Sequence, residues 1–392
     1  MRRALEQVRD GRIQPRIKAR QVVMGLFFML TTRLGSLNGV EEAFRLCGRR
    51  TRWHTWFGGD LPSADRLGEV AALTNADDVR TVLHAHYALR RRKKTLTPLP
   101  GGLRMLILDG HEMFASYLKC CPDCLEREIT FKDGVRTQYY HRYVAAFLLC
   151  GGGRLLLDLE LQRKGEGEIA AAIRLLERLF QGYPRAFDLV AGDALYLDPT
   201  LCRYVLQCGK DFMAVLKNEN RDLIQDFRGL SPGTEPLELE YKNKHCSCRD
   251  VEGFNSWTQL GSDVRVVSSE EIVSVRRQQT KEQETITSEW LWATSLSKEK
   301  VGTAAVLFLG HGRWKIENWG FNELDRHWHA DHLYYHDANA ILVILLLLFV
   351  AYNVFHAWLS RGIKPQLRQR YTVGHFVKLI VAQFYNEFSH PT

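Results

Sequence analysis

The segment Leu103-Arg104-Met105-Leu106-Ile107-Leu108, followed at once by Asp109 and Gly110, decides the fold. All of it except Arg104 is apolar, and a short apolar run that ends at a turn residue predicts a buried strand. A stretch rich in proline and glycine, residues 97–102, comes just before it and predicts a linker. We therefore expect a new domain to begin near residue 99 with this strand.

Strands and helices alternate after this point. Two further strands are expected at residues 139–150 and 155–161, joined by a turn at three consecutive glycines, 151–153. The elements expected next are a helix at 166–180, a strand at 187–191 ending before Asp193, a helix at 199–207 and a strand at 212–216. The order β-β-β-α-β-α-β predicts an α/β fold, a mixed sheet with helices on its faces, and it is the order of a ribonuclease-H-like fold.

The regions before residue 99 and after residue 218 have sequence patterns that differ from that of the core. Residues 1–98 favour helices, expected at 18–33, at 40–46, and from an N-cap at Ser63 to about His86. Residues 219–290 favour a β-rich insertion, after which the main domain resumes with a strand at 291–295 and a helix at 301–324. The insertion strands are expected at 237–241, 264–267, 272–275 and 284–286. The expected domains are 1–98 (helical, DNA-binding), 99–218 (first part of the core), 219–288 (insertion), 289–361 (second part of the core) and 362–392 (tail).

Composition narrows the class of protein. The 392 residues carry a formal net charge of +8, which favours a polyanionic partner. Nine scattered cysteines argue against a disulfide framework and for a reducing cytoplasm. The uncharged run at residues 340–352 is shorter than the roughly 18 residues that a spanning helix needs, so it predicts a buried core helix and no membrane partner.

Three acidic residues occupy positions suited to metal chemistry. Asp109 and Asp193 each follow an expected strand, at the edge where open α/β sheets bind ligands. Glu317 lies in an expected helix with Arg313 on the same face at i, i+4 spacing. Phosphoryl transfer by two Mg²⁺ ions needs carboxylates of this kind, and Arg313 is suited to hold a phosphate. Taken singly, each acid is better explained as a turn former or a helix cap, so the prediction depends on the three together.

Together these residues resemble one family. The blocks Ile107-Leu108-Asp109-Gly110, Ala191-Gly192-Asp193-Ala194-Leu195-Tyr196 and Arg313-Trp314-Lys315-Ile316-Glu317-Asn318 are similar to the three blocks of bacterial insertion-sequence DDE transposases, over about residues 100–356. The acids are 84 and 124 residues apart, and the second gap accommodates the β-rich insertion of the subgroup with a Tyr-Arg-Glu-Lys signature. Half of that signature is missing here, because Gly310 stands at the Tyr position and Leu324 at the Lys position.

The resemblance implies an activity, its cofactors and its partners. It implies Mg²⁺ (or Mn²⁺)-dependent cleavage of element ends and strand transfer, by a bacterial, nucleoid-associated homodimer that binds terminal inverted repeats and target DNA. Asp109, Asp193 and Glu317 are the expected catalytic metal ligands. The expected DNA contacts are Arg313, Arg326, Lys217, Trp292, Arg90, Arg91, Arg92, Lys93 and Lys94. Trp257, Trp290 and Trp292 are suited either to stacking on bases or to core packing.

A second metal site is suggested by Cys121-Pro122-Asp123-Cys124 and the later His141, since thiolates and imidazole at such spacing suit a structural Zn²⁺. The alternative is a pair of free thiols. A second C-x-x-C is missing, and Cys246-Ser247-Cys248 is the nearest substitute. In the tract containing His327, His329, His332 and His336, the last two have i, i+4 spacing and could form a metal pair, but no acidic general base stands between them. The tract is therefore expected to be polar surface or a DNA contact.

Three other functions fit parts of the pattern. A nuclease of the same fold would cut without joining, and a strand-transfer assay would separate it from a transposase. A decayed copy would bind DNA only, and a zinc-binding structural protein would have no activity at all.

Overall fold

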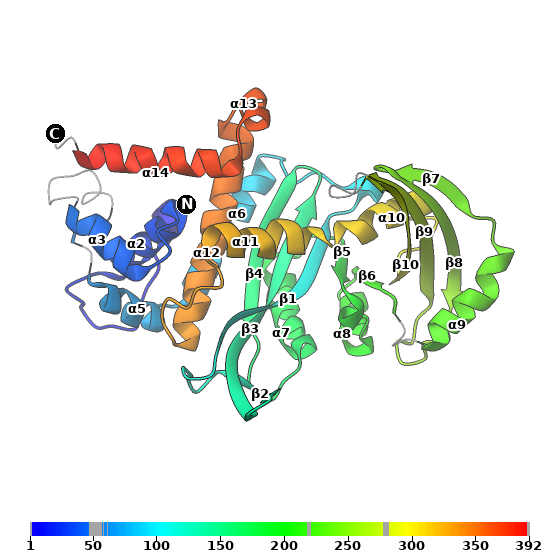
Figure 1. Cartoon of the computed structure of the whole chain (residues 1–392), viewed down its shortest axis with the longest axis horizontal. Coiled ribbons are helices and arrows are strands. Elements are labelled where there is room, and N and C mark those ends of the chain that lie inside the picture. The colour runs from blue at the N-terminus through cyan, green and yellow to red at the C-terminus, as the bar shows by residue number, and fades with distance from the viewer. Residues whose placement is uncertain are drawn as a thin grey trace.

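A single large sheet forms the centre of the protein (Figure 1). The computed structural model describes residues 2–46, 57, 59–60, 62–217, 221–276 and 282–389. Within them, the ten-stranded sheet has the order β2-β3-β1-β5-β6-β10-β9-β8-β7, with β4 paired to β3. The core strands are β1 (Met105–Ser116), β2 (Leu125–Phe131), β3 (Gly134–Cys150), β4 (Gly153–Leu161), β5 (Leu189–Gly192) and β6 (Asp211–Val215).

The core has the expected α/β, ribonuclease-H-like topology. β1 pairs antiparallel with β3 and parallel with β5, and β5 pairs parallel with β6. Helices α7 (Glu168–Gly182) and α8 (Pro199–Gln207) make the crossovers, as predicted. Strand β2 was not predicted, because most of its side chains are exposed and its sequence lacks an apolar pattern. It forms a hairpin with the first half of β3.

The β-rich insertion continues the core sheet. It consists of α9 (Arg221–Leu230), β7 (Leu237–Tyr241), β8 (Lys244–Phe254), β9 (Val264–Arg276) and β10 (Gln283–Thr294). The prediction of separate strands at 264–267 and 272–275 was wrong, because β9 runs through both. The polar residues between them resembled a break, yet Glu271 is fully buried in an ion pair of 2.7 Å with Lys244. β10 likewise joins two expected strands, and its end pairs with β6.

The N-terminal helices lie at the end of the molecule opposite the insertion (Figure 1). They are α1 (Arg2–Leu5), α2 (Ala19–Thr32), α3 (Leu37–Leu46), α5 (Ala64–Leu73) and α6 (Ala76–Arg92). Helices α2, α5 and α6 pack on the long helix α12 (Ala338–Gly362), whereas α1 and α3 pack on other N-terminal helices. The single helix expected up to His86 is wrong. Asn75 caps a new helix by accepting from the N–H groups of Asp77 and Asp78, and this ends α5 before α6 begins.

Helix α12 contains the apolar run at 340–352, which lies in the core as predicted. In the part of the chain that is described, it is the one single helix long and apolar enough to cross a membrane, and 78% of its most apolar window is buried in the protein. Helices α2 and α3 pass the same test only as a pair bent by 100°.

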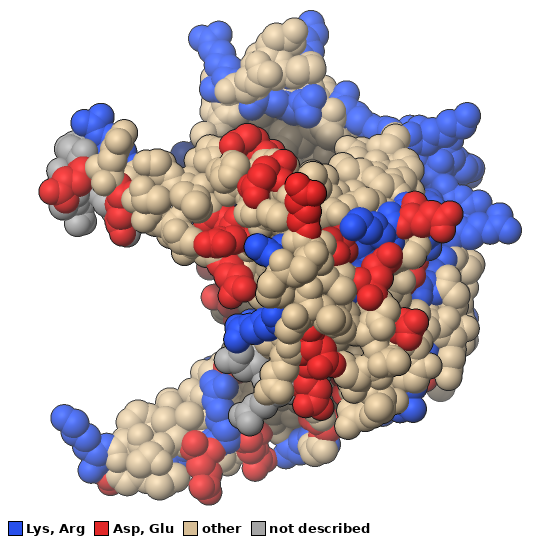
Figure 2. Space-filling view, turned by 90° about the vertical axis from the view of Figure 1, so that its right-hand side faces the viewer, with Lys and Arg blue, Asp and Glu red and all other residues tan. Residues whose placement is uncertain are grey.

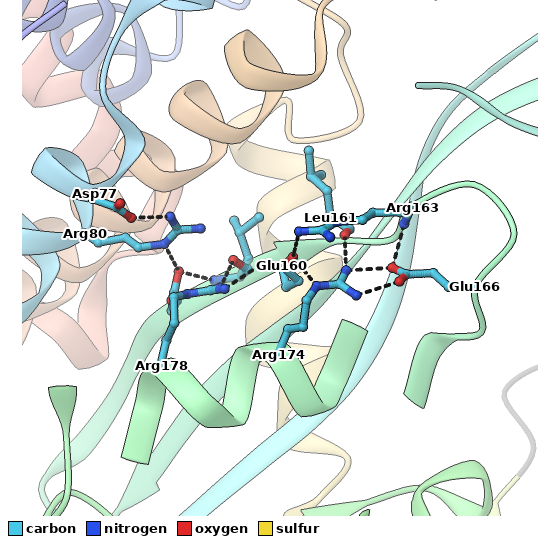
Figure 3. A network of polar contacts seen from close by, with 10 residues as sticks. Asp77, Arg80, Glu160, Leu161, Arg163, Glu166, Arg174 and Arg178 are labelled. Carbon is cyan, nitrogen blue, oxygen red and sulfur yellow. Dashed lines mark hydrogen bonds and ion pairs between the residues drawn. The ribbon is translucent and has the colours of Figure 1, made fainter. Parts of the chain in front are cut away.

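Arginines from two helices hold the acidic residues of β4 (Figure 3). Arg80 of α6 and Arg178 of α7 each contact the buried Asp158 at 3.0 Å. Arg178 also binds Glu160 at 2.6 Å, and Arg174 binds Glu160 at 2.9 Å. Arg80 thereby links α6 to the core sheet, while the arginines of α7 pair with the acids that burial partly shields from water.

The segment expected as one helix at 301–324 is divided. It comprises α10 (Thr303–Gly312), a π-helical turn η4 (Ile316–Phe321) and α11 (Asn322–Trp328). The expected tail after residue 361 contains two helices, α13 (Pro365–Arg370) and α14 (Val373–Ser389).

Candidate active site

The two aspartates lie at matching positions on neighbouring strands. The parallel register between β1 and β5 ends with Ile107 opposite Ala191, and each aspartate is two residues further along its chain. β1 continues beside β3, whereas β5 ends at Gly192, so the two chains separate where the aspartates occur. Such a separation at the carboxyl ends of parallel strands is where open α/β sheets bind ligands.

Arg313 connects the third acid to the first. Its Nη1 atom lies 3.5 Å from Asp109 Oδ2 and 3.1 Å from Glu317 Oε1, and the arginine is buried. Glu317 stands in the π-helical turn, where the N–H of Asn322 donates to its carbonyl oxygen. Turns of this type occur frequently at functional sites. The arginine therefore brings the helix acid and the strand acid to one side of the sheet.

The surroundings of Asp109 shift its pKa. Burial raises the pKa of Asp109 to about 7, Arg313 opposes that rise, and Asp193, Glu317 and Glu168 add to it. The three predicted acids are more open than a closed metal cage, because no set of their oxygens lies within 4.8 Å among the described residues. A carboxylate that is costly to ionise, beside two further acids, suits a bound cation.

A buried polar group that was not predicted lies near the aspartates. Glu168 at the start of α7 is buried, accepts a 2.8 Å hydrogen bond from the Tyr196 hydroxyl and lies 2.8 Å from the Arg142 guanidinium. Its signal in the sequence was the glycine beside each aspartate. A Cβ on Gly110 would lie 2.3 Å from Glu168, and one on Gly192 would lie 2.4 Å from the Tyr196 ring. Both glycines make room for this group.

Trp292, an expected DNA contact, is 2% exposed and belongs to the core. Its ring explains the missing signature tyrosine, because a Cβ on Gly310 would lie 2.4 Å from it. The position of the signature lysine is equally unsuitable, since Leu324 is fully buried. Trp257 is buried as well, and Trp290 stacks on Trp292 with ring centroids 6.3 Å apart.

Trp314 and Trp319 are exposed aromatic side chains near Glu317, and neither was among the predicted base-stacking residues. Arg154 and Lys315 lie over the Trp319 ring. Trp314 is 37% exposed, and the guanidinium carbon of Arg313 lies 4.4 Å from the centre of its ring. Its place next to Arg313 in the third block was the available signal. Arg326 and Lys217 are both exposed, as a phosphate contact requires.

The basic run at the end of α6 divides into two kinds of residue. Arg90 is buried and donates to Thr95 Oγ1 at 2.7 Å and to the Gly152 carbonyl at 3.3 Å, so its guanidinium serves the fold. Arg91, Arg92, Lys93 and Lys94 are exposed.

In the view of Figure 2, Lys and Arg side chains gather at the top and along one edge of the molecule. A hollow opens on the other side, between two projecting arms.

The thiols and imidazole expected at a second site do lie together. Cys121 Sγ and Cys124 Sγ are 3.4 and 3.3 Å from His141 Nε2. His336, assigned with its neighbours to polar surface or DNA contact, instead lies 3.1 Å from Cys124 Sγ. The group of close ligand atoms includes neither Cys246 nor Cys248, which lie in β8.

Comparison with known protein families agrees with the topology. The family model described as a transposase DDE domain matches residues 105–354, which is well over half of the chain and includes all three acids. A search of curated proteins gave no match. The chain therefore belongs to the DDE transposase family, the enzymes that move insertion sequences from one DNA site to another.

Proposed function

We propose that this transposase cuts the ends of its element and joins them to target DNA by Mg²⁺- or Mn²⁺-dependent phosphoryl transfer at Asp109, Asp193 and Glu317. The observation that carries the proposal is the matched position of the two aspartates where β1 and β5 separate, with Glu317 linked to Asp109 through Arg313. Each acid comes from a different element, so the site depends on the complete core.

The residues present fit divalent metal ions of the hard type. All three side chains offer carboxylate oxygens, which Mg²⁺ prefers, and the raised pKa of Asp109 reflects burial and negative charge that a cation would relieve. When bound, two such ions activate the attacking oxygen and stabilise the leaving oxygen of an in-line displacement. The spread of the acids leaves room for the ions to keep water and to bind phosphate oxygens.

The other residues hold and orient the DNA. Arg313 offsets the charge of Asp109 and Glu317, and its planar guanidinium suits a phosphate once the acids bind metal. Trp314 offers an exposed ring for a displaced base, and Arg326 and Lys217 are free to meet the backbone. Because both ends of an element must be cut, we propose that the enzyme acts as a homodimer on its terminal repeats.

The decisive experiment compares Asp193→Asn with Asp198→Asn on a labelled duplex that carries the element's own terminal repeat. Asp198 is a matched control, because it also caps a helix, accepting from the N–H groups of Thr200 and Leu201, but lies outside the acidic cluster. We expect Asp198→Asn to nick the repeat end in Mg²⁺ as wild type does, and Asp193→Asn to bind the repeat without cutting it.

Cutting by Asp193→Asn at the wild-type rate would refute the assignment of Asp193. Adding target DNA then separates transposase from nuclease, since joined products are expected only from a transposase. Binding of the repeat without cutting by wild type would instead favour a DNA-binding derivative.

A further inference from the structure

A second group of metal-ligating side chains lies apart from the acids. Cys121 and Cys124 come from the loop before β2, His141 from β3, and His336 from the segment that leads into α12. We propose that these four side chains form a structural zinc site with two sulfur and two nitrogen ligands. The proposal does not depend on the catalytic mechanism above.

The distances between the ligand atoms match a tetrahedron around one ion. Zinc bonds of about 2.3 Å to sulfur and about 2.0–2.1 Å to nitrogen give tetrahedral edges of about 3.8 Å between sulfurs and about 3.5 Å between sulfur and nitrogen. The two sulfurs are 3.6 Å apart. The recorded sulfur–nitrogen distances are 3.4, 3.3 and 3.1 Å. All four ligand atoms lie within 4.8 Å of one another.

The backbone prepares the two thiols for a metal. The N–H of Cys124 donates to the Cys121 carbonyl at 3.2 Å, which closes a tight turn. The N–H of Cys121 points at Cys124 Sγ, 3.3 Å away, and such a bond stabilises a thiolate. Cys124 and His141 are also buried, at 0% and 3% exposed. The turn therefore holds both sulfurs on the side that faces the imidazoles.

A disulfide explains the arrangement less well than a metal. The sulfur separation of 3.6 Å is far longer than a disulfide bond of about 2.05 Å. A redox pair also needs no imidazoles, whereas two converge here from positions 195 residues apart in the chain. Two sulfurs and two nitrogens in a tetrahedron are the donor set typical of Zn²⁺.

The location of the group suggests what the ion stabilises. His141 is paired with Met113 of β1, the strand that carries Asp109, and His336 immediately precedes Asp337, the N-cap of α12. One ion would thus join the loop after β1 to the start of the central helix. Four protein ligands leave no open position for a substrate, so the role is structural.

The test is metal analysis of the full-length chain, purified without added metal and desalted. We expect one zinc per chain in wild type, and loss of that zinc in His336→Ala and Cys121→Ser. The matched controls, His332→Ala and Cys120→Ser, alter exposed neighbours outside the group and should retain it. Cobalt substituted into wild type should give the strong visible absorption of a tetrahedral thiolate site, and it should not do so in the first two variants.

A second measurement on wild type covers the case in which the variants do not fold. Titration with a thiol-specific mercurial should release the zinc as two protected cysteines react. Wild type that lacks zinc after growth in zinc-supplemented medium, or whose Cys121 and Cys124 are found joined as a disulfide, would overturn the proposal. A folded His336→Ala variant that keeps a full zinc equivalent and the wild-type cobalt spectrum would overturn the assignment of His336.

Discussion

The acidic cluster and the cysteine–histidine group are two regions suited to metal ions, built on opposite principles. The acids offer hard oxygens, are not within 4.8 Å of one another as a set, and include a one-third-exposed Glu317. The cysteines and histidines offer soft donors, converge within 4.8 Å and include a fully buried Cys124. A metal site that binds substrate leaves coordination positions open, whereas a structural metal site fills them with protein ligands.

Brief chelation should abolish cleavage without removing zinc, and this is the largest effect that we expect. After EDTA and rapid desalting, we expect cleavage of the terminal repeat to fall by at least about a thousandfold, which corresponds to several kcal/mol of transition-state stabilisation. Added Mg²⁺ should restore it, because open carboxylate sites exchange ions freely. Zinc content, measured on the same sample, should stay unchanged.

If EDTA removed zinc and activity together, and zinc alone restored cleavage, the division into one catalytic and one structural site would be wrong. A zinc-depleted sample to which Mg²⁺ is added provides the control. Mg²⁺ should restore cleavage only in the fraction of protein that remains folded without zinc.

The sequence predicted the core fold well because its elements have strong local patterns. The helix at 199–207 appears with the expected bounds. The apolar run before Asp109 does form a strand, but the expectation that the strand ends there was wrong, because β1 continues to Ser116 in its pairing with β3. The insertion was predicted less well, because β9 buries Glu271 and so breaks the alternation that marks a strand. A buried charge is acceptable there only because Lys244 pairs with it, and that pairing lies 27 residues away in the chain.

The candidate sites show the same limit. The three acidic blocks stand out in the sequence, and the assignment of their acids as metal ligands stays a prediction. The contact between His336 and Cys124 could not be predicted, because it spans 212 residues and arises only where the chain leads into α12. Trp292 was assigned to DNA by its type, but its burial follows from the space at Gly310, which no local pattern reveals.

Asp109→Asn should stabilise the metal-free protein while abolishing cleavage. The pKa of Asp109 is raised from 3.8 to about 7, so the folded state binds its proton more tightly than the unfolded state. The stability contributed by this proton is therefore complete below pH 4 and is lost as the pH rises towards 7. At pH 8 the wild-type charge costs up to about 4 kcal/mol, at 1.36 kcal/mol per pKa unit.

Thermal unfolding in EDTA at pH 5 and at pH 8 measures this effect. We expect the variant to exceed wild type by several degrees at pH 8 and by less at pH 5, because wild-type Asp109 is already protonated there. Mg²⁺ should narrow the gap at pH 8 by stabilising wild type alone. An equal difference in melting temperature at both pH values would mean that the charge of Asp109 does not destabilise the folded protein.

Trp314→Ala should have the smallest effect, a weaker binding of DNA at the acidic cluster. A stacked base is worth about 1–3 kcal/mol, so we expect repeat DNA with an unpaired terminal base to bind about tenfold more weakly, with zinc content unchanged. Trp358→Ala is the matched control, because Trp358 is 38% exposed against 37% for Trp314 but lies near the end of α12. Fluorescence anisotropy on fully paired and frayed duplexes measures both. Equal losses in the two variants would indicate a general effect of removing an exposed ring, whereas a loss for Trp314 on the frayed duplex alone would place the displaced base beside the acids.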